Sequence, residues 1–221
     1  MEHHWNTVYQ TKDTTQVSWY QDYPKTSLDL ITVTGVEKSR PLLDVGGGDS
    51  CLVDVLLASG YTDVTVVDIA ALALEKAQSR LGAQAQQIRW IVADVLHLPD
   101  DLQVDLWHDR AAFHFLRMPE DIARYAENAA QHIKPHGYLV LGTFSLRGPQ
   151  ECSGLPVSRY SEETIKRVFR PDFQPIRSFE EEHTTPFHTT QFFLWTIFKK
   201  ISSVEVPHLL SREHVCSLDK A

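Results

Sequence analysis

Three short β-type runs, each with an aspartate at or beside its end, constrain the fold of this chain most strongly. The runs and their aspartates are residues 41–45 with Asp44, 64–67 with Asp68, and 88–92 with Asp94. Helical patterns of apolar residues lie between the runs and end at Gly60 and Gly82, which suit helix C-termini. Strands that alternate with helices in this way predict a parallel α/β sheet with right-handed crossovers.

The second half of the chain continues the alternation and then changes. Strands are predicted over 104–107 and 138–144, helices over 121–133 and 161–169, a turn over 135–137, and two final strands over 173–182 and 189–199. Ser161 and Thr164 resemble a capping box at the start of the later helix. No helical pattern separates the final two strands, so we expect an antiparallel hairpin at one edge of the sheet.

Composition indicates one globular, water-soluble domain. The chain has 221 residues, 43% hydrophobic and 23% charged, and its net charge of −8 disfavours a nucleic-acid partner. Three widely spaced cysteines, Cys51, Cys152 and Cys216, form neither a disulfide framework nor a zinc signature. No apolar run is long enough to cross a membrane and no signal peptide is evident, so we expect a cytoplasmic protein without a membrane partner.

The two ends of the chain differ from the central pattern. Residues 4–34 mix aromatic and polar side chains, and Pro24 is expected to open a helix with Leu28, Ile31 and Val33 turned inward. Residues 201–221 have little periodicity and are expected to be a loosely held tail or a docking segment. The expected layout is therefore a domain over 1–200, with residues 1–36 as a lid and 40–200 as the core, and then the tail.

The strand-end aspartates predict a ligand site. In open α/β sheets, ligands bind beyond the carboxyl ends of the strands, where these side chains would converge. The turn Gly46-Gly47-Gly48 allows close approach of a ligand, and the carboxylate of Asp68, 24 residues after Asp44, suits a ribose diol. A nicotinamide dinucleotide fits less well, because Cys51 stands where its fingerprint needs a third glycine. Asp44, directly before the turn, suits a ligand with positive charge.

These residues resemble the cofactor motifs of the class I S-adenosylmethionine (SAM) methyltransferases, and the resemblance covers about residues 5–200. It implies that Asp44, Gly46 and Gly48 hold the methionine part of SAM, and Ser50 stands where a third glycine is common. It further implies that Asp68, beside Ile69, binds the ribose, and that Asp94 and Val95 contact the adenine. It also implies a Rossmann-like, seven-stranded, mostly parallel sheet with helices on both faces and an antiparallel C-terminal hairpin.

Finer resemblances involve the lid and two loops. Trp5-x-x-x-Tyr9 followed by Ser18-Trp19-Tyr20-Gln21 is similar to the lid of the thiopurine methyltransferase-like small-molecule enzymes and of the methyltransferase-like lysine methyltransferases. Trp19 and Tyr20 would then close over SAM, although they could instead anchor an N-terminal helix. The segment from Asp105 to Ala111 is similar to the W-D-R-G motif of the thiopurine group and to the D-K-G motif of the lysine group. Gly154-Leu155-Pro156 is similar to the G-P-P segment of the thiopurine group.

The residues after the fourth strand are candidate catalytic residues. His108 and, further on, His114 are candidate general bases. Asp109 could accept from the SAM amino group or a substrate amine, and Arg110 could bind an anionic group of the substrate. The alternative is that Asp109 and Arg110 pair with each other and shape the loop, and that both histidines are structural.

We expect a SAM-dependent methyltransferase with a small-molecule acceptor, a thiol or another soft nucleophile being favoured. A protein lysine methyltransferase and a SAM-binding module without turnover are the alternatives. An open acidic groove would favour the lysine enzyme, and a closed apolar pocket under Trp19 and Tyr20 the small-molecule enzyme. No metal is expected, because His183 and His188 have no third ligand at suitable spacing.

Overall fold

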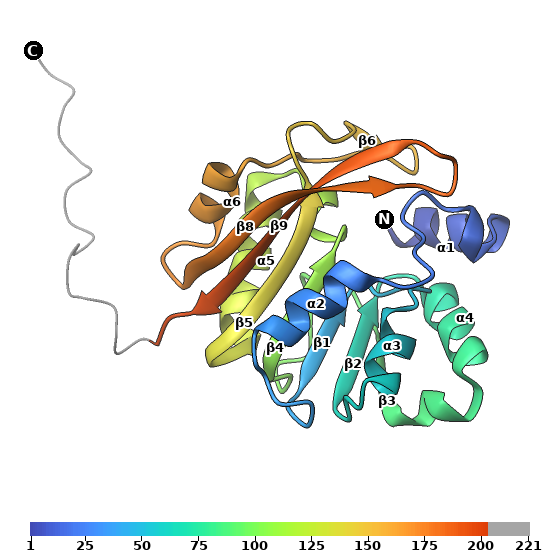
Figure 1. Cartoon of the computed structure of the whole chain (residues 1–221), viewed down its shortest axis with the longest axis horizontal. Helices are drawn as coiled ribbons and strands as arrows, with labels where there is room; N and C mark the ends of the chain where they lie inside the picture. Colours follow the sequence, from blue (N-terminus) through green and yellow to red (C-terminus); the bar gives the residue numbers. More distant parts are fainter. Residues whose placement is uncertain (203–221) are drawn as a thin grey trace, which may run out of the picture.

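A sheet of seven strands, in the order β3-β2-β1-β4-β5-β9-β8, forms the centre of the computed structural model, which describes residues 1–202 (Figure 1). The strands are β1 (Leu42–Val45), β2 (Val64–Asp68), β3 (Ile88–Val92), β4 (Val104–Arg110), β5 (Ile133–Phe144), β8 (Phe173–Thr184) and β9 (Thr190–Lys200). β1 to β5 pair in parallel, whereas β9 is antiparallel to both of its neighbours, β5 and β8. The predicted fold class, with its hairpin at one edge, is confirmed.

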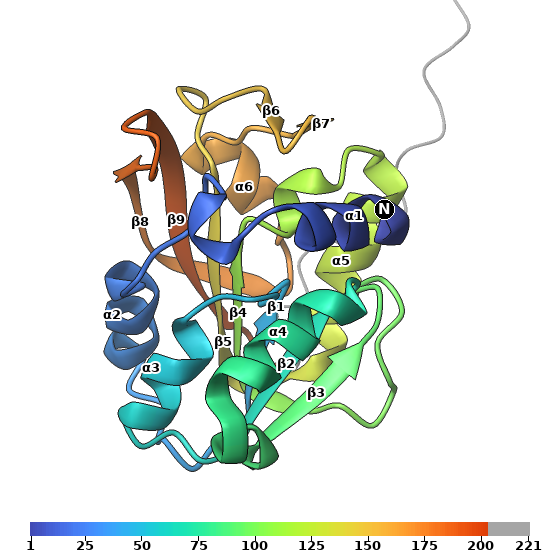
Figure 2. The same cartoon turned by 90° about the vertical axis from the view of Figure 1, so that its right-hand side faces the viewer.

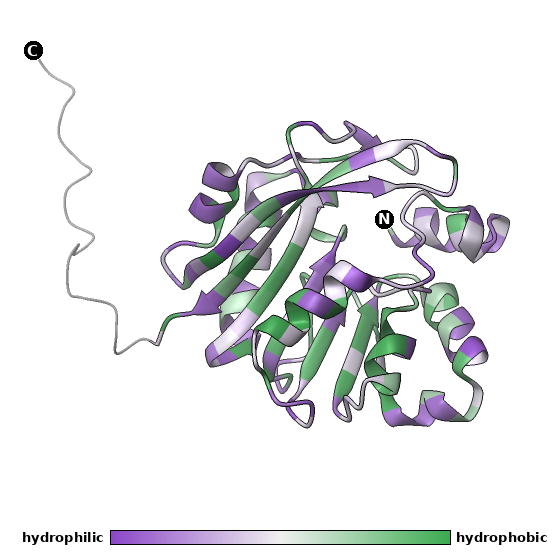
Figure 3. Ribbon diagram, in the orientation of Figure 1, coloured by the Kyte–Doolittle hydropathy of each residue, from purple (hydrophilic) through white to green (hydrophobic). Residues whose placement is uncertain are grey.

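Helices cover both faces of the sheet. They are α1 (Glu2–Thr11), α2 (Lys25–Val33), α3 (Leu52–Ala58), α4 (Ala71–Leu81), α5 (Pro119–His132) and α6 (Glu162–Val168), and a two-stranded hairpin, β6 (Glu151–Cys152) with β7 (Leu155–Pro156), follows β5. Alternation along each strand divides the core. Leu42 and Leu106 pack toward α2, α3 and α4, and Leu43 and Trp107 pack toward α5 and α6. Figure 3 shows the apolar residues concentrated along the strands and on the inner sides of the helices.

The predicted helix ends agree with the structure, but one predicted inner face is wrong. Gly82 ends α4 with a φ of +56°, and the capping box between Ser161 and Thr164 is formed. In α2, Val33 is 60% exposed while Ser27 and Leu30 are buried beside Ile31. Two residues of a helix that are two apart do not share a face, so Val33 points away from the core when Ile31 points into it.

β4 is longer than predicted. The apolar run ends at Trp107, but the strand continues to Arg110, so His108, Asp109 and Arg110 belong to the strand rather than to the loop after it. Successive side chains of a strand point to opposite faces, which separates Asp109 from His108 and Arg110. The predicted turn over 135–137 lies inside β5, where His136 has a φ of +66° and the pairing with β4 is irregular.

α1 lies across the carboxyl-terminal ends of the strands and packs against α4 (Figure 2). The segment after it returns over the same edge to α2, so residues 1–24 cover the carboxyl-terminal ends of the central strands. Within residues 1–202, no helix is long and apolar enough to span a membrane. Most of the predicted tail, residues 203–221 with Cys216, lies outside the described residues.

Candidate cofactor and substrate site

Two adjoining cavities lie under α1 and its linker. The larger, of about 150 Å³, is lined by these predicted site residues: Trp19, Gly46, Asp68, Ile69, Asp94, Val95 and Arg110. The smaller, of about 50 Å³, is lined by Trp19, Tyr20, Asp44, Gly46, Ser50, His108 and Arg110. Trp19, Gly46 and Arg110 border both. The strand ends therefore bring together nearly all the residues that the sequence predicted for this site.

The glycine turn after β1 can be built only from glycine. Gly46 has a φ of +63°, and a Cβ there would lie 2.6 Å from the Cβ of Ala112. Gly48 has a φ of +50°, and a Cβ there would lie 2.4 Å from the hydroxyl oxygen of Tyr9. Side chains at these positions would be strained by the backbone and would also fill the space beside the carboxylates.

The carboxylates of Asp68 and Asp94 border the larger cavity from the ends of β2 and β3. Oδ1 of Asp68 accepts from the amide of Ala70 at 2.8 Å, and Oδ1 of Asp94 accepts from the amide of Leu96 at 2.9 Å. Burial, helped by the charge of Asp44, raises the pKa of Asp68 to about 6, so the group is ionised at neutral pH. These backbone hydrogen bonds fix both carboxylates at the cavity wall.

Asp44 and His108 form a buried pair beside the smaller cavity. Nδ1 of His108 lies 2.7 Å from Oδ1 of Asp44, and Nε2 lies 3.0 Å from Oγ of Ser27 in α2. Both ring nitrogens are therefore occupied. These bonds engage His108 with protein side chains, and its expected role as a general base stays a prediction.

Asp109 points to the opposite face of β4 and lines neither cavity. Its carboxylate accepts from the amide of Ala112 at 2.9 Å, from that of Phe113 at 3.1 Å and from the hydroxyl of Tyr125 at 2.6 Å. Burial raises its pKa to about 6. The prediction that Asp109 contacts SAM or a substrate amine is corrected, because the extension of β4 turns it into the core, where it shapes the following turn.

Arg110 extends from β4 to the border of both cavities. Nη1 donates to the backbone oxygen of Trp19 at 2.9 Å, and the guanidinium lies 4.9 Å from the ring centre of Phe193. Burial lowers its pKa to about 10, so it remains a cation at neutral pH. Among residues 1–202 its side chain is within ion-pair distance of no carboxylate, Asp109 included, although the charge of Glu181 partly offsets the effect of burial on its pKa. Arg110 can therefore receive an anionic group.

His114 is buried and lines neither cavity. Neither ring nitrogen has a hydrogen-bond partner among the described residues, and the ring packs between Phe115 and Phe144. Burial, with the charge of Arg110, lowers its pKa to about 3. A neutral, weakly basic imidazole behind the wall of the cavity is unsuited to remove a proton from a substrate.

Tyr9 belongs to the predicted lid motif, but the sequence analysis did not predict it as a residue of the cofactor site. It lies on α1, is buried, and lines both cavities, with its hydroxyl beside the turn at Gly48. Burial, helped by the charge of Asp68, raises its pKa well above the ordinary value, so the phenol stays protonated. Trp5 packs against Tyr9, Trp19 and Phe115, which completes an aromatic cover. The spacing Trp5-x-x-x-Tyr9, one turn of a helix, was the available signal.

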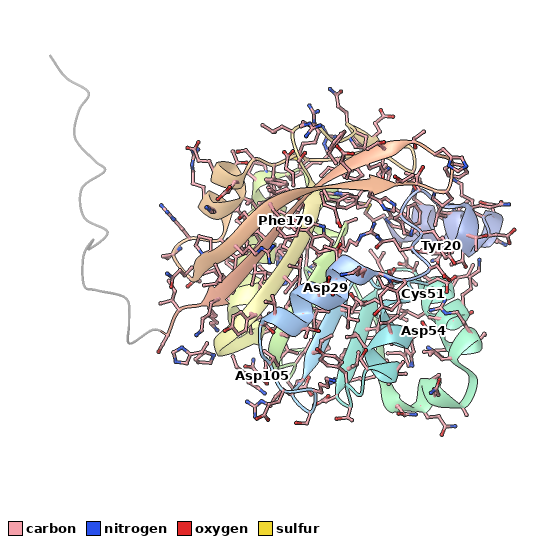
Figure 4. The ribbon with its side chains drawn as sticks, in the orientation of Figure 1. Tyr20, Asp29, Cys51, Asp54, Asp105 and Phe179 are labelled. Atoms are coloured by element: carbon pink, nitrogen blue, oxygen red, sulfur yellow. The ribbon has the colours of Figure 1, made fainter. Side chains whose placement is uncertain are left out.

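The lid and the glycine turn are tied to each other and to α4. Arg80 of α4 donates to the backbone oxygens of Asp49 at 3.2 Å and Ser50 at 2.8 Å, and also contacts the Asp49 carboxylate. Thr14, in the lid, donates to that same carboxylate. The hydroxyl of Ser50 accepts from the amide of Leu52 at 3.1 Å and so starts α3. Figure 4 shows Tyr20 on the lid linker near Cys51, where α3 begins.

The remaining candidate residues have simpler places. Cys152 lines the larger cavity, and burial raises the pKa of its thiol. Nε2 of His183 lies 2.9 Å from the backbone oxygen of Ser18. Residues 1–202 contain no cluster of His, Cys, Asp and Glu that could hold a metal ion.

The comparisons with known proteins agree with this arrangement. Residues 42–137 match a family model described as a methyltransferase domain. No protein with a curated description matches the sequence.

Solved structures share the fold at low sequence identity. One, described under the conversion of a disulfide bond into a thioacetal group during echinomycin biosynthesis, has a TM-score of 0.73 at 17% identity, over 91% of this chain and 93% of that one. The N-methyltransferase NodS from Bradyrhizobium japonicum, in complex with S-adenosylhomocysteine, scores 0.66 at 15% identity over 88% and 96%. The 1,6-didemethyltoxoflavin-N1-methyltransferase of Burkholderia thailandensis scores 0.65 at 18% identity over 91% and 84%.

Proposed function

We propose that this chain is a class I SAM-dependent methyltransferase, an enzyme that transfers the methyl group of SAM to a small-molecule acceptor. The observation that carries the proposal is the meeting of Asp44, Asp68 and Asp94 around the glycine turn, under an aromatic cover. The likeness to the thiopurine and lysine groups in particular stays a prediction.

The residues present fit SAM. SAM carries a sulfonium and an ammonium, and the cavities are bordered by carboxylates on the side of Asp44 and Asp68. The turn at Gly46 and Gly48 keeps open the space that a Cβ would fill. Asp68 would bind the ribose hydroxyls, Asp94 and Val95 the adenine, and Asp44 the ammonium. When bound, SAM supplies the activated methyl group, so the protein mainly has to orient the acceptor and exclude water.

The aromatic wall of the larger cavity favours a small acceptor over a protein. Trp5, Trp19, Phe115 and Phe193 line the larger cavity, and Arg110 is the cation at its border. A small molecule with an apolar part and an anionic group suits this lining. An open, acidic groove would favour a lysine enzyme, and the aromatic lining differs from such a groove.

The places of the two candidate bases, His108 and His114, favour a thiol or another soft nucleophile as the acceptor. His108 is bonded at both nitrogens, and His114 lies behind the wall with a lowered pKa. A thiol has an ordinary pKa of about 8.5 and ionises with little help, whereas a lysine ammonium, at about 10.4, does not. The neighbour described under disulfide-to-thioacetal conversion is consistent with sulfur chemistry on this fold. Cys51 and Cys152 are free, which fits the cytoplasm as the location.

Isothermal titration of SAM and S-adenosylhomocysteine, with NAD as the control ligand, tests the cofactor. We expect micromolar binding of both and none of NAD. Labelled SAM with matched pairs of small thiols and amines, with and without a carboxylate, then tests the acceptor. Methyl transfer to a small thiol supports the proposal. Cofactor binding with transfer only to protein substrates would favour a lysine methyltransferase, and binding with no transfer would favour a non-catalytic module.

A further inference from the structure

We propose that His108 and Ser27 are positioning residues that hold Asp44 in the orientation needed to bind the ammonium group of the cofactor. The inference rests on the proposed function and deepens it. It gives His108 a task different from proton removal, and it gives Ser27, which lies outside the glycine motif, a place in cofactor recognition.

The three side chains form a chain of contacts across three elements. Asp44 and His108 are direct neighbours in the register between β1 and β4, and their side chains meet at 2.7 Å. The second nitrogen of His108 meets the hydroxyl of Ser27, in α2, at 3.0 Å. Asp44, His108 and Ser27 are only 3%, 2% and 1% exposed, so water does not compete for these bonds.

The two carboxylate oxygens of Asp44 have different surroundings. Oδ1 is the atom that contacts His108. Oδ2 lies on the side of the glycine turn, where a Cβ on Gly47 would come within 2.7 Å of it. All three residues of the chain of contacts line the smaller cavity, which continues under the lid. His108 therefore holds one oxygen and leaves the other directed to the turn.

The hydrogen-bond roles follow from the chemistry of the three groups. An ionised carboxylate only accepts, so Nδ1 of His108 carries the proton and donates it to Asp44. A serine hydroxyl can donate or accept, so Ser27 can bond to Nε2 and fix the ring in place. A carboxylate held in this orientation would attract an ammonium.

The same contacts could serve the fold alone, so the experiment must separate the two roles. S-adenosylhomocysteine has the amino acid part that Asp44 would recognise. 5′-Methylthioadenosine has the adenosine part but lacks the amino and carboxylate groups. A positioning role affects only the first ligand, whereas a general disturbance of the site weakens both.

Matched amide variants of His108 give the sharpest test. In His108→Asn, the side-chain NH₂ takes the place of Nδ1 and can still donate a hydrogen bond to Asp44. In His108→Gln, the side-chain NH₂ takes the place of Nε2 and cannot donate to Asp44. We expect His108→Gln to bind S-adenosylhomocysteine about ten- to a hundredfold more weakly, the loss of one charge-assisted hydrogen bond. His108→Asn should stay within about threefold of the wild type. Both should bind 5′-methylthioadenosine like the wild type.

Ser27→Ala removes a single hydroxyl and keeps the test independent of how well the His108 variants fold. We expect a several-fold loss for S-adenosylhomocysteine and no change for 5′-methylthioadenosine. Equal losses of affinity for both ligands would overturn the inference and leave the proposed function intact. An unchanged affinity for S-adenosylhomocysteine in Ser27→Ala or in His108→Gln would do the same. A wild-type protein that binds neither SAM nor S-adenosylhomocysteine would overturn both.

Discussion

The contact between Gly48 and Tyr9 gives the most direct test of how the lid closes on the site. Gly48→Ala places a methyl group at a φ of +50°, where an L-residue is strained by about 1–2 kcal/mol. That methyl group would also lie 2.4 Å from the hydroxyl oxygen of Tyr9, which must then move by about 1 Å to reach ordinary contact. Displacing this buried phenol also disturbs its hydrogen bonding near the turn, which costs about 1 kcal/mol more.

Together these effects predict a loss of about 3 kcal/mol in the free energy of unfolding, or about 6–12 °C in Tm for a chain of this size. Tyr9→Phe removes the clashing oxygen, and the next ring atom, Cζ, would lie 3.3 Å from the new methyl. In the Tyr9→Phe background, Gly48→Ala should therefore cost only the backbone strain. The difference, a coupling of about 1–2 kcal/mol, is measurable by urea unfolding of the two single variants and the double variant. Strictly additive effects would show that the hydroxyl does not lie against the turn.

Three further outcomes follow from the site. Asp68→Ala should weaken SAM binding by about 1–3 kcal/mol in a protein that still folds, and unchanged affinity by titration would contradict the ribose assignment. Because the pKa of Asp68 is about 6 and its ionised form is the better acceptor, SAM affinity should rise as the pH rises through about 6 and then level off. The same pH series should be flat near pH 6 in Asp68→Asn if Asp68 is the group responsible. Asp109→Ala should lower stability by about 2–4 kcal/mol, because buried donors lose their acceptor, and leave SAM affinity nearly unchanged; a folded, stable variant with lost binding would contradict this.

The sheet could be predicted from the sequence because its signals are local. Each of β1, β2 and β3 is a short apolar run, and an aspartate at or beside its end marks the edge where a ligand is predicted to bind. Neighbouring strands and their order then follow from the general rules for α/β sheets. The residues predicted to hold the cofactor, around Asp44, Asp68 and Asp94, were proposed for the same reason, and nearly all of them line the two cavities.

The catalytic candidates could not be placed because their partners are distant in sequence. The polar residues His108 to Arg110 read as a loop after Trp107, yet they stay in the strand because each has a partner in the fold. His108 meets Asp44 and Ser27, and Arg110 meets the backbone of Trp19. Neighbouring residues of a strand point to opposite sides of the sheet. For this reason His108 and Arg110 border the cavities, whereas Asp109 does not.

Both ends of the domain contribute to the wall of the larger cavity, which affects when this wall can form during synthesis. The wall of the larger cavity combines Trp5, from the first helix, with Phe193, from the last strand. During synthesis the N-terminal part of a chain is available first, but α1 would find only part of its docking surface until β9 has been made. A growing chain can thus form the early strands while holding no enclosed space for a ligand. The complete wall of the cavity can therefore form only after both ends of the domain have been made.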